Sequence, residues 1–356
     1  TFRAFRVFRS GLNCSFWISA PSLQDSIFML VTYYFRQPQP HLHSLEELFA
    51  TVLDALPEDI RARKVELPAA EASLRGLWRN SAFARRCQGD VNHIAGHVNY
   101  CALALDRPTV LTIPDVRSSL TGGFIRNMLV KALWFWLPAL KVSRITVISE
   151  FTAKEVARLI PFARGKIQVI YCPVNRKLKY APKALDAKEP RILHIGTKPN
   201  KNLERTARAL EGIPCKLAII GAIPAADAMV LKEVGIAYEN YVDLPYEEVV
   251  RQYELCDLVC FASTYEGFGM PIVEANAVGR PVVAGRAGAM PEVAGDAACL
   301  VDPYDVEAIR SGVLRVIRDQ AYRETLVRNG LENVKRFAPE TIASQYAQVY
   351  REVAKT

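Results

Sequence analysis

Short β-branched and aromatic runs alternate with helical patterns from one end of the 356-residue chain to the other. This alternation is typical of βαβ units and parallel sheets, so we predict an α/β fold. The predicted strands cover residues 27–34, 64–67, 91–94, 109–113, 144–148 and 166–171 in the first half and 191–195, 216–220, 237–241, 258–262, 281–284 and 298–301 in the second. Each half therefore has enough strands for a sheet of its own.

The segment 181–190 separates the two halves. It has two prolines, four charged residues and no hydrophobic period, which is typical of a linker. We therefore predict one domain over residues 1–180 and a second over residues 191–339. The closing helix, residues 340–356, carries an apolar stripe at helical spacing that predicts core packing: Ile342, Tyr346, Val349, Tyr350 and Val353. Because this helix follows the completed second domain, we expect it to pack back on the first.

The net charge of +8 is concentrated in residues 1–180, where 24 Lys and Arg stand against 13 Asp and Glu. No basic run with interleaved aromatic residues marks a nucleic-acid surface, so we do not expect nucleic acid as a partner. No stretch reaches the ~18 apolar residues of a membrane span, and no signal peptide opens the chain. The eight cysteines form no Cys-x-x-Cys pair, which favours free thiols in the cytoplasm over zinc ligands.

The strongest chemical signal is a glycine-bearing loop between a predicted strand and a predicted helix. Gly267 and Gly269 lie in this loop, and Pro271 stands where a helix can begin. Free backbone N–H groups at such a helix start form a phosphate site. Glu266 precedes the helix and Glu274 stands in its first turn, so both can accept hydrogen bonds from hydroxyl groups on either side of a bound phosphate. A tight βα turn with surface acids is the alternative interpretation.

The segment from Glu266 to Glu274, Glu-Gly-Phe-Gly-Met-Pro-Ile-Val-Glu, resembles the Glu-x7-Glu signature of the family-4 retaining glycosyltransferases. These enzymes have the GT-B fold, in which two Rossmann-like domains face a central cleft. Further segments agree in order and spacing, namely 195–203, 241–244, 287–296 and 301–303 and, less tightly, 90–93, 110–115 and 147–152. The resemblance covers residues 85–340. It implies transfer of a sugar from a UDP-, GDP- or ADP-linked donor to a sugar or lipid-linked acceptor in cell-envelope biosynthesis.

The resemblance also assigns roles to single residues. Lys198 and Lys201 lie on a glycine-containing turn, where their ammonium groups can reach the anion that the Gly267–Gly269 loop holds. In the family an Arg after this glycine and a later Lys hold the diphosphate; here Lys201 occupies the lysine position, Thr197 replaces the Arg, and Lys198 is the candidate substitute. The implied donor-binding residues are Gly196, Lys198, Lys201, Leu244, Glu266, Gly267, Phe268, Gly269, Met270 and Glu274.

The first domain departs from the family at Pro114, where related enzymes have a His that contacts the donor sugar. Asp115 and His97 are the nearest polar candidates to compensate, so with Glu266 and Lys201 they complete the expected catalytic set. His93 and His97 are spaced like zinc ligands but lack the glutamate of a zinc-hydrolase helix, and either histidine fits a structural role equally well. The chain has no Asp-x-Asp, so we expect neither a divalent metal nor another cofactor.

Three alternatives remain open at this stage. A phosphorylase or a sugar-nucleotide epimerase has the same fold, although no pyridoxal lysine context is found and epimerases do not carry this Glu-x7-Glu segment. A catalytically silent nucleotide-binding subunit is motivated by Pro114 and Thr197. Residues 128–137 contain two tryptophans in the basic half, which predicts either peripheral contact with the anionic inner face of the membrane or an ordinary core helix.

Overall fold

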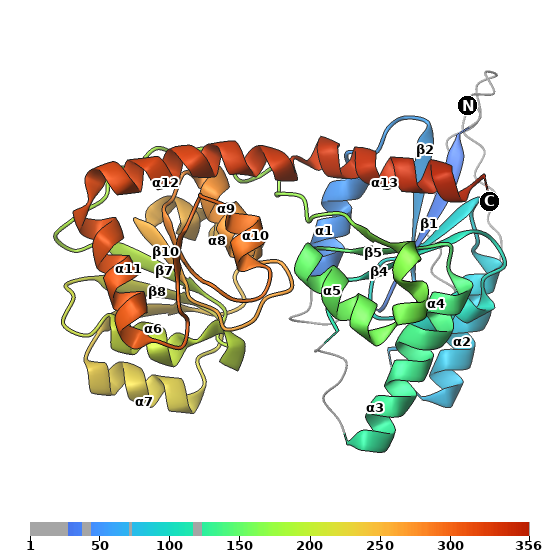
Figure 1. Ribbon diagram of the computed structural model, residues 1–356, viewed down its shortest axis with the longest axis horizontal. Helices are drawn as coiled ribbons and strands as arrows, with labels where there is room; N and C mark the ends of the chain where they lie inside the picture. The colour runs from blue at the N-terminus through green and yellow to red at the C-terminus, as the bar shows by residue number, and fades with distance from the viewer. Residues whose placement is uncertain (1–27, 38–43, 71–72, 117–122, 356) are drawn as a thin grey trace, which may run out of the picture.

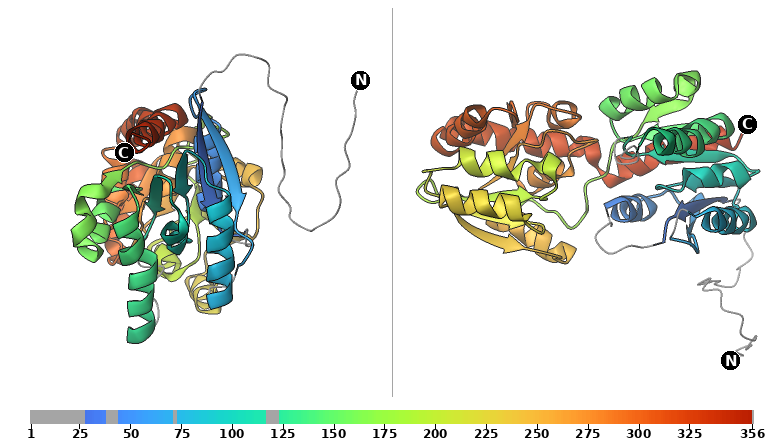
Figure 2. Two further views of the ribbon diagram at one scale, coloured as in Figure 1. Left: turned by 90° about the vertical axis from the view of Figure 1, so that its right-hand side faces the viewer. Right: turned by 90° about the horizontal axis from the view of Figure 1, so that it is seen from below.

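The computed structural model describes residues 28–37, 44–70, 73–116 and 123–355. Within these ranges the chain forms two six-stranded sheets, and neighbouring strands in both are parallel. Helices cover both faces of each sheet (Figures 1 and 2). This is the α/β GT-B arrangement of two Rossmann-like domains.

The first sheet has the strand order β2-β1-β3-β4-β5-β6. Its strands are β1 (Met29–Phe35), β2 (Ile60–Glu66), β3 (Val91–Ile94), β4 (Thr109–Ile113), β5 (Arg144–Val147) and β6 (Ile167–Val169). The helical segments are α1 (Ser44–Leu53), α2 (Leu74–Arg86), η1 (Asn99–Ala104), α3 (Phe124–Val130), η3 (Lys131–Trp136), α4 (Leu137–Lys141), α5 (Glu150–Leu159) and η4 (Pro161–Lys166). The order of the strands along the sheet changes direction between β1 and β3.

The second sheet has the strand order β12-β11-β10-β7-β8-β9. Its strands are β7 (Arg191–Ile195), β8 (Lys216–Ile220), β9 (Ala237–Tyr241), β10 (Leu258–Phe261), β11 (Val282–Gly285) and β12 (Cys299–Val301). The helical segments are η5 (Pro199–Lys201), α6 (Leu203–Ala209), α7 (Ala225–Val234), α8 (Tyr246–Leu255), α9 (Met270–Val278), α10 (Met290–Ala294), α11 (Val306–Arg318), α12 (Gln320–Asn333) and η6 (Val334–Phe337). Here the direction changes between β7 and β10, and open parallel sheets bind ligands at the carboxyl ends of the strands at such a point.

Each predicted strand is present, and all but one lie within about two residues of the predicted ends. The exception is β2, which begins at Ile60 rather than at residue 64. This strand lies at the edge of the sheet, and Arg61, Ala62 and Lys64 are not buried. Charged residues are common on edge strands because they discourage pairing with another chain. The first half of β2 is therefore too polar to show the apolar pattern from which the strands were predicted.

The last helix, α13 (Pro339–Val353), crosses from the second domain and packs on the first sheet (Figure 1). Its apolar stripe joins a buried cluster with side chains of β1, α1 and β3. Within this cluster Tyr350 Oη lies 2.6 Å from Tyr33 Oη and 2.7 Å from His93 Nδ1. Hydrogen bonding therefore supplements apolar burial in fixing how this helix sits on the first domain.

A second crossing connects β6, which ends at Val169, with β7, which begins at Arg191. The buried Arg280 guanidinium donates to the carbonyl of Ala181 at 2.7 Å and to that of Glu254 at 2.7 Å. Both carbonyls thereby gain a charge-assisted hydrogen bond. The start of the predicted linker is thus attached to the second domain.

The segment expected either to touch a membrane or to form a core helix lies in a continuous helical run from α3 through η3 to α4. Trp134 Nε1 donates to the carbonyl of His97 at 2.9 Å, and Trp136 Nε1 donates to that of Leu159 at 3.0 Å. Both indole rings are half-buried against the core of the first domain, which favours the core interpretation for these two residues. The most exposed apolar side chains of this run lie earlier, at Phe124 and Ile125, although Leu129 is also 59% exposed. Across the described ranges, every helix is too short or too polar to span a bilayer.

Candidate active site between the domains

The loops that follow β7 and β10 are joined at the point where the second sheet reverses its strand order. Lys201 Nζ lies 2.7 Å from Glu266 Oε1. Asn200 Nδ2 donates to Glu266 Oε1 at 3.3 Å and to the carbonyl of Tyr265 at 2.9 Å. The Lys201 and Glu266 side chains are 19% and 14% exposed, so water screens their interaction less than it does a surface pair. This ion pair places one cation and one carboxylate where the fold binds ligands.

Gly196 makes room for the Lys201 side chain. Its φ of +86° favours glycine, and a Cβ built here would lie 3.0 Å from Lys201 Cγ and Cε. The neighbouring Thr197, which replaces the family Arg, donates from Oγ1 to the carbonyl of Ala222 at 2.6 Å. Lys198 is exposed, and its carbonyl accepts from the Lys201 N–H at 2.8 Å. The structure therefore joins Lys201 to Glu266, whereas Lys198 lies nearer solvent.

Residues 262–269, named here the signature loop, lead from β10 into α9. Gly269 has a φ of +107° and forms the N-cap of α9, and a proline stands in the first turn of this helix. Gly288 packs closely against the Glu266 backbone, because a Cβ at this position would lie 2.5 Å from the Glu266 carbonyl oxygen. The Ala289 N–H donates to that same oxygen at 3.0 Å. The loop that follows β11 therefore fixes the Glu266 backbone.

Glu274 lies in the second turn of α9, one turn later than expected, because the helix begins at Met270. Tyr253 Oη donates to Glu274 Oε2 at 2.5 Å, and Tyr246 Oη donates to Oε1 at 3.4 Å. Burial raises the pKa of Glu274, although the two hydroxyl groups oppose that rise. Each carboxylate oxygen retains a lone pair after these bonds, so Glu274 can accept further hydrogen bonds.

The segment 241–244, which resembles the base-binding turn of the family, starts at the end of β9. Asp243 has a φ of +55°, and Leu244 is half-buried beside it. Tyr246, which contacts Glu274, comes two residues after Leu244 and begins α8. The turn is thus connected through α8 to the second glutamate of the signature.

The signature loop contacts the first domain directly. A Cβ on Gly267 would lie 3.0 Å from the carbonyl oxygen of Pro114, in the loop that follows β4. Ser149 Oγ donates to the carbonyl of Gly267 at 2.6 Å, and Thr152 Oγ1 donates to it at 3.1 Å. The two domains therefore meet where the Glu-x7-Glu segment turns into its helix.

His97 and Asp115 follow neighbouring strands of the first sheet, β3 and β4. Burial lowers the pKa of His97 most strongly and the positive charge of Arg36 lowers it further, while the negative charges of Asp115 and Glu46 oppose this. His97 also has a φ of +48°, which is uncommon for a residue with a side chain and is frequent at functional sites. His93, in contrast, is buried in β3, with Nε2 2.7 Å from Thr112 Oγ1. The two histidines therefore differ in environment, and the burial and hydrogen bonds of His93 fit a structural residue.

The sequence analysis assigned no role to several residues of this site, although they lie in the family-matching segments 147–152 and 287–296. Ser149 and Thr152 belong to an N-cap pattern that could have been recognised, but nothing in that pattern indicates a contact with Gly267. Glu292 accepts backbone hydrogen bonds from Glu150 and Phe151, which lie more than 140 residues away in sequence. No local signal predicts such a contact. Within the described ranges, no three His, Cys, Asp or Glu side chains gather as metal ligands.

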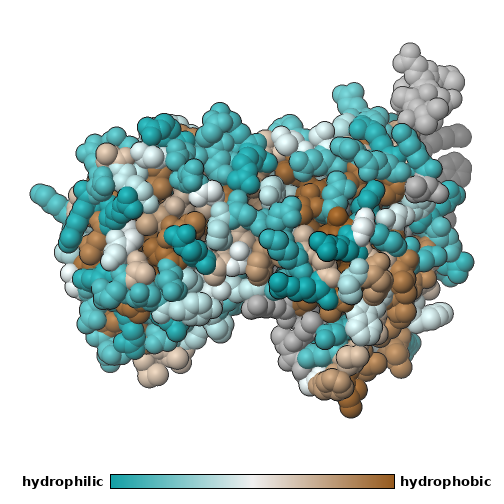
Figure 3. All heavy atoms as spheres, viewed as in Figure 1, coloured by the Kyte–Doolittle hydropathy of each residue, from teal (hydrophilic) through white to brown (hydrophobic). Residues whose placement is uncertain are grey.

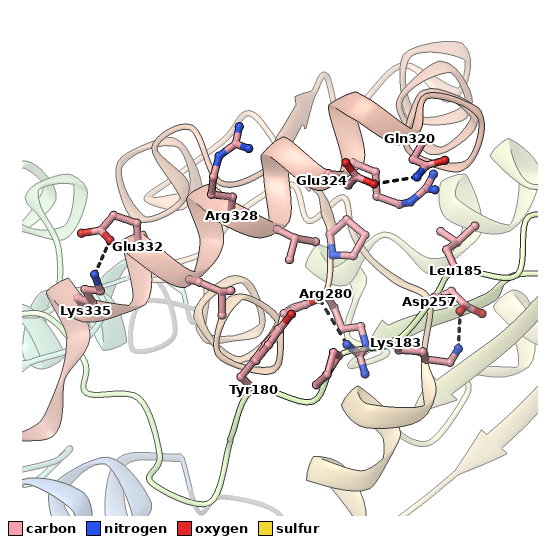
Figure 4. Close-up of a pocket in the computed structure, with 18 residues that line it drawn as sticks. Tyr180, Lys183, Leu185, Asp257, Arg280, Gln320, Glu324, Arg328, Glu332 and Lys335 are labelled. Atoms are coloured by element: carbon pink, nitrogen blue, oxygen red, sulfur yellow. Dashed lines mark hydrogen bonds and ion pairs between the residues drawn. The ribbon is translucent and has the colours of Figure 1, made fainter.

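A pocket of about 910 Å³ lies elsewhere, between the linker and α12 (Figure 4). Its walls include Asp257, which precedes β10, and Pro281, which precedes β11. These positions are at the amino ends of the strands, whereas ligands bind at the carboxyl ends in such sheets. In Figure 4, Lys183 pairs with Asp257 and Lys335 with Glu332, so two of its basic groups are already partnered. The pocket therefore does not belong to the candidate site.

Known proteins resemble this chain in both halves. The family model described as glycosyl transferases group 1 matches residues 175–333, and that of glycosyltransferase family 4 matches residues 35–178. The chain is 30% identical over 230 residues to the O-antigen chain mannosyltransferase B of Escherichia coli. This alignment covers 58% of the chain and 60% of the relative, less than two thirds of its length.

Solved structures share the fold at low sequence identity. The structure of Anabaena HepE in complex with UDP and glucose has a TM-score of 0.72 and 17% identity over 91% of this chain and 100% of that one. WaaG, a glycosyltransferase involved in lipopolysaccharide biosynthesis, has a TM-score of 0.68 and 13% identity over 90% and 99%. Since the two family models together span residues 35–333, the chain belongs to the group 1, family 4 glycosyltransferases.

Proposed function

We propose that this protein transfers a sugar from a nucleotide diphosphate sugar to an acceptor hydroxyl, with retention of the anomeric configuration. The observation that carries the proposal is the Lys201–Glu266 pair, which lies where the second sheet reverses its strand order. As the bond from the sugar carbon to the β-phosphate breaks, negative charge grows on the leaving diphosphate. Lys201, Lys198 and the backbone N–H groups of residues 267–270 stabilise this charge without a metal ion.

The carboxylates orient the donor in this proposal. Glu266 accepts hydrogen bonds from the sugar hydroxyls and Glu274 from the ribose, while the turn at Leu244 holds the base. The acceptor oxygen bonds to the sugar carbon on the face that the leaving group vacates, and its proton passes to the leaving phosphate. His97 and Asp115 supply the polar contacts that Pro114 cannot, because they follow neighbouring strands on the facing sheet.

The relative in Escherichia coli is named an O-antigen chain mannosyltransferase, which supports mannose as the transferred sugar and a cell-envelope polysaccharide as the product. The test is a panel of GDP-, UDP- and ADP-linked sugars offered with mannoside acceptors, with the product anomer read by NMR. We expect turnover with one nucleotide mannose and an α-linked product. Nucleotide binding without turnover of any donor would instead favour the silent-subunit alternative.

The proposed location is the cytoplasmic face of an anionic membrane, which the first domain contacts through two helices. In α2, Leu74 and Trp78 are 86% and 72% exposed, and in α3, Phe124 and Ile125 are 82% and 76% exposed. Figure 3 shows apolar side chains gathered at the lower end of this domain, over α3, and both helices extend toward that end in Figures 1 and 2. The same helices carry exposed basic side chains, namely Arg75, Arg79 and Arg126.

Flotation with vesicles of phosphatidylglycerol and phosphatidylcholine tests this contact. We expect the wild-type protein to float at low salt and a Phe124→Ser/Ile125→Ser variant to remain at the bottom. Met229→Ser is the matched control, because Met229 is 68% exposed on α7 of the other domain. A wild-type protein that does not float at any salt concentration would refute the membrane proposal but leave the transfer proposal standing.

A further inference from the structure

Helix α5 of the first domain is attached to the second domain by a set of polar contacts that nucleotide binding alone does not require. The carbonyl of Gly267 accepts from Ser149 Oγ at 2.6 Å and from Thr152 Oγ1 at 3.1 Å. Ser149 and Thr152 are fully buried. A buried hydroxyl group is costly unless it is hydrogen-bonded, so these bonds stabilise the contact between the domains.

The N-terminus of α5 is capped from the other domain. Glu292, in α10, accepts from the Glu150 N–H at 2.7 Å through Oε1 and from the Phe151 N–H at 2.9 Å through Oε2. The first N–H groups of a helix have no partner within the helix, and the helix dipole favours a negative charge there. Ser149 caps the same helix by accepting from the Thr152 N–H, and Glu292 adds partners for the two preceding N–H groups. The cap from Glu292 exists only while the two domains are together.

The same contacts fix the orientation of one peptide group in the signature loop. The described residues contain no cis peptide bond, so the Gly267 carbonyl and the Phe268 N–H point in opposite directions. Because the two hydroxyl groups hold the carbonyl toward the first domain, the Phe268 N–H points away from it, into the second domain. This N–H is one of those assigned to the leaving diphosphate. Beside it, Tyr265 Oη donates to Glu155 Oε2 at 2.5 Å, which adds a further bond between α5 and the loop.

We propose that Ser149, Thr152 and Glu292 are positioning residues that orient the signature loop for sugar transfer when the domains close. This inference rests on the proposed function and deepens it. The nucleotide contacts residues of the second domain, so its binding depends little on these three side chains. The transfer step needs both domains and an accurately directed N–H, so kcat depends on them strongly.

The test compares pairs of variants of the full chain. Ser149→Ala removes the N-cap of α5 together with the contact to Gly267, whereas Ser73→Ala removes the equivalent N-cap of α2, where Ser73 accepts from the Gly76 N–H at 3.1 Å. Glu292→Ala removes a carboxylate that caps a helix of the other domain. The control variant Asp305→Ala removes a carboxylate that caps its own helix, α11, by accepting from the N–H groups of Glu307 and Ala308. Thr152→Val removes the hydroxyl group, and Thr152→Ser restores it.

Three quantities are measured for each variant: kcat for donor turnover, Kd for the nucleotide by calorimetry, and the radius of gyration by small-angle scattering. We expect Ser149→Ala, Thr152→Val and Glu292→Ala to lower kcat about tenfold or more while Kd changes less than about threefold. Their radius of gyration rises in the absence of nucleotide. Ser73→Ala, Asp305→Ala and Thr152→Ser behave like the wild type in all three measurements.

Equal kcat and equal radius of gyration in each pair would overturn the inference. A parallel loss of kcat and of nucleotide affinity would also overturn it, because it would show that the residues support binding rather than orientation. Failure of the wild-type protein to bind any nucleotide would refute the proposed function instead. In that case the scattering measurements still decide whether the three residues hold the domains together.

Discussion

The residues around Lys201 hold its ammonium group against the signature loop. Gly196 leaves room for its methylene chain, the ring of Phe261 lies 4.8 Å from Nζ, and Glu266 pairs with it at 2.7 Å. The sequence places Lys198 and Lys201 on the same turn, and only the resemblance separates them, by giving Lys201 the lysine position of the family. The distinction arises from Glu266 and Asn200, because Glu266 belongs to a different loop. A sequence motif can therefore identify the position of the lysine but not the side chain that pairs with it.

Substitution of Gly196 tests this arrangement. Gly196→Ala places a methyl group 3.0 Å from two carbons of Lys201, so the lysine side chain must shift and its contact with Glu266 is weakened. We expect nucleotide affinity to fall about tenfold, as for the loss of a charged hydrogen bond. Gly212→Ala is the control, because Gly212 has a similar φ of +69° and its Cβ would meet no atom within 4 Å. Alanine is strained at both positions because φ is positive in each. Only Gly196→Ala should lower the nucleotide affinity measured by calorimetry.

Local pattern predicted the strands well, but among the contacts between the domains it indicated only the packing of α13 on the first one. Strands buried on both faces, such as β10 and β11, are continuous apolar runs that can be recognised without knowing their neighbours. The stripe of α13 could be recognised for the same reason. The partners that fix these elements are distant in sequence: Tyr350 lies 257 residues from His93, and Glu292 lies 142 residues from Glu150. Such pairs follow from topology, which composition and periodicity do not contain.

Two buried histidines, His93 in β3 and His194 in β7, predict how the free energy of unfolding depends on pH. Burial lowers the pKa of His93 to about 3 and that of His194 to about 4, so both remain neutral in the folded protein. The unfolded chain binds protons below about pH 6.5, so stability is lost as the pH falls through that value. We expect unfolding by urea to become easier between pH 7 and pH 5, by about 2 kcal/mol for each histidine. His93→Gln should flatten this dependence, and an unchanged slope would contradict the assignment.

Among the described residues, two crossings and a group of contacts around α5 join the domains. The linker and the run from α12 through η6 to α13 cross between them (Figure 1), and α5 meets the signature loop at the site itself. The basic first half of the chain does not hold the proposed phosphate site. The nearly neutral second half holds it with a few local groups, so net charge is a poor guide to where the nucleotide binds. The charge of the first half fits an acceptor presented at an anionic surface.

The central claim is that Lys201 and Glu266 mark a nucleotide diphosphate site. Calorimetric titration of GDP, UDP and ADP into the wild-type protein, Lys201→Ala and Lys198→Ala tests it most directly. We predict that one nucleotide binds the wild type, that Lys201→Ala lowers the affinity for it at least about tenfold, and that Lys198→Ala lowers this affinity less. Binding of none of the three nucleotides to the wild type, or equal binding to the wild type and Lys201→Ala, would contradict it.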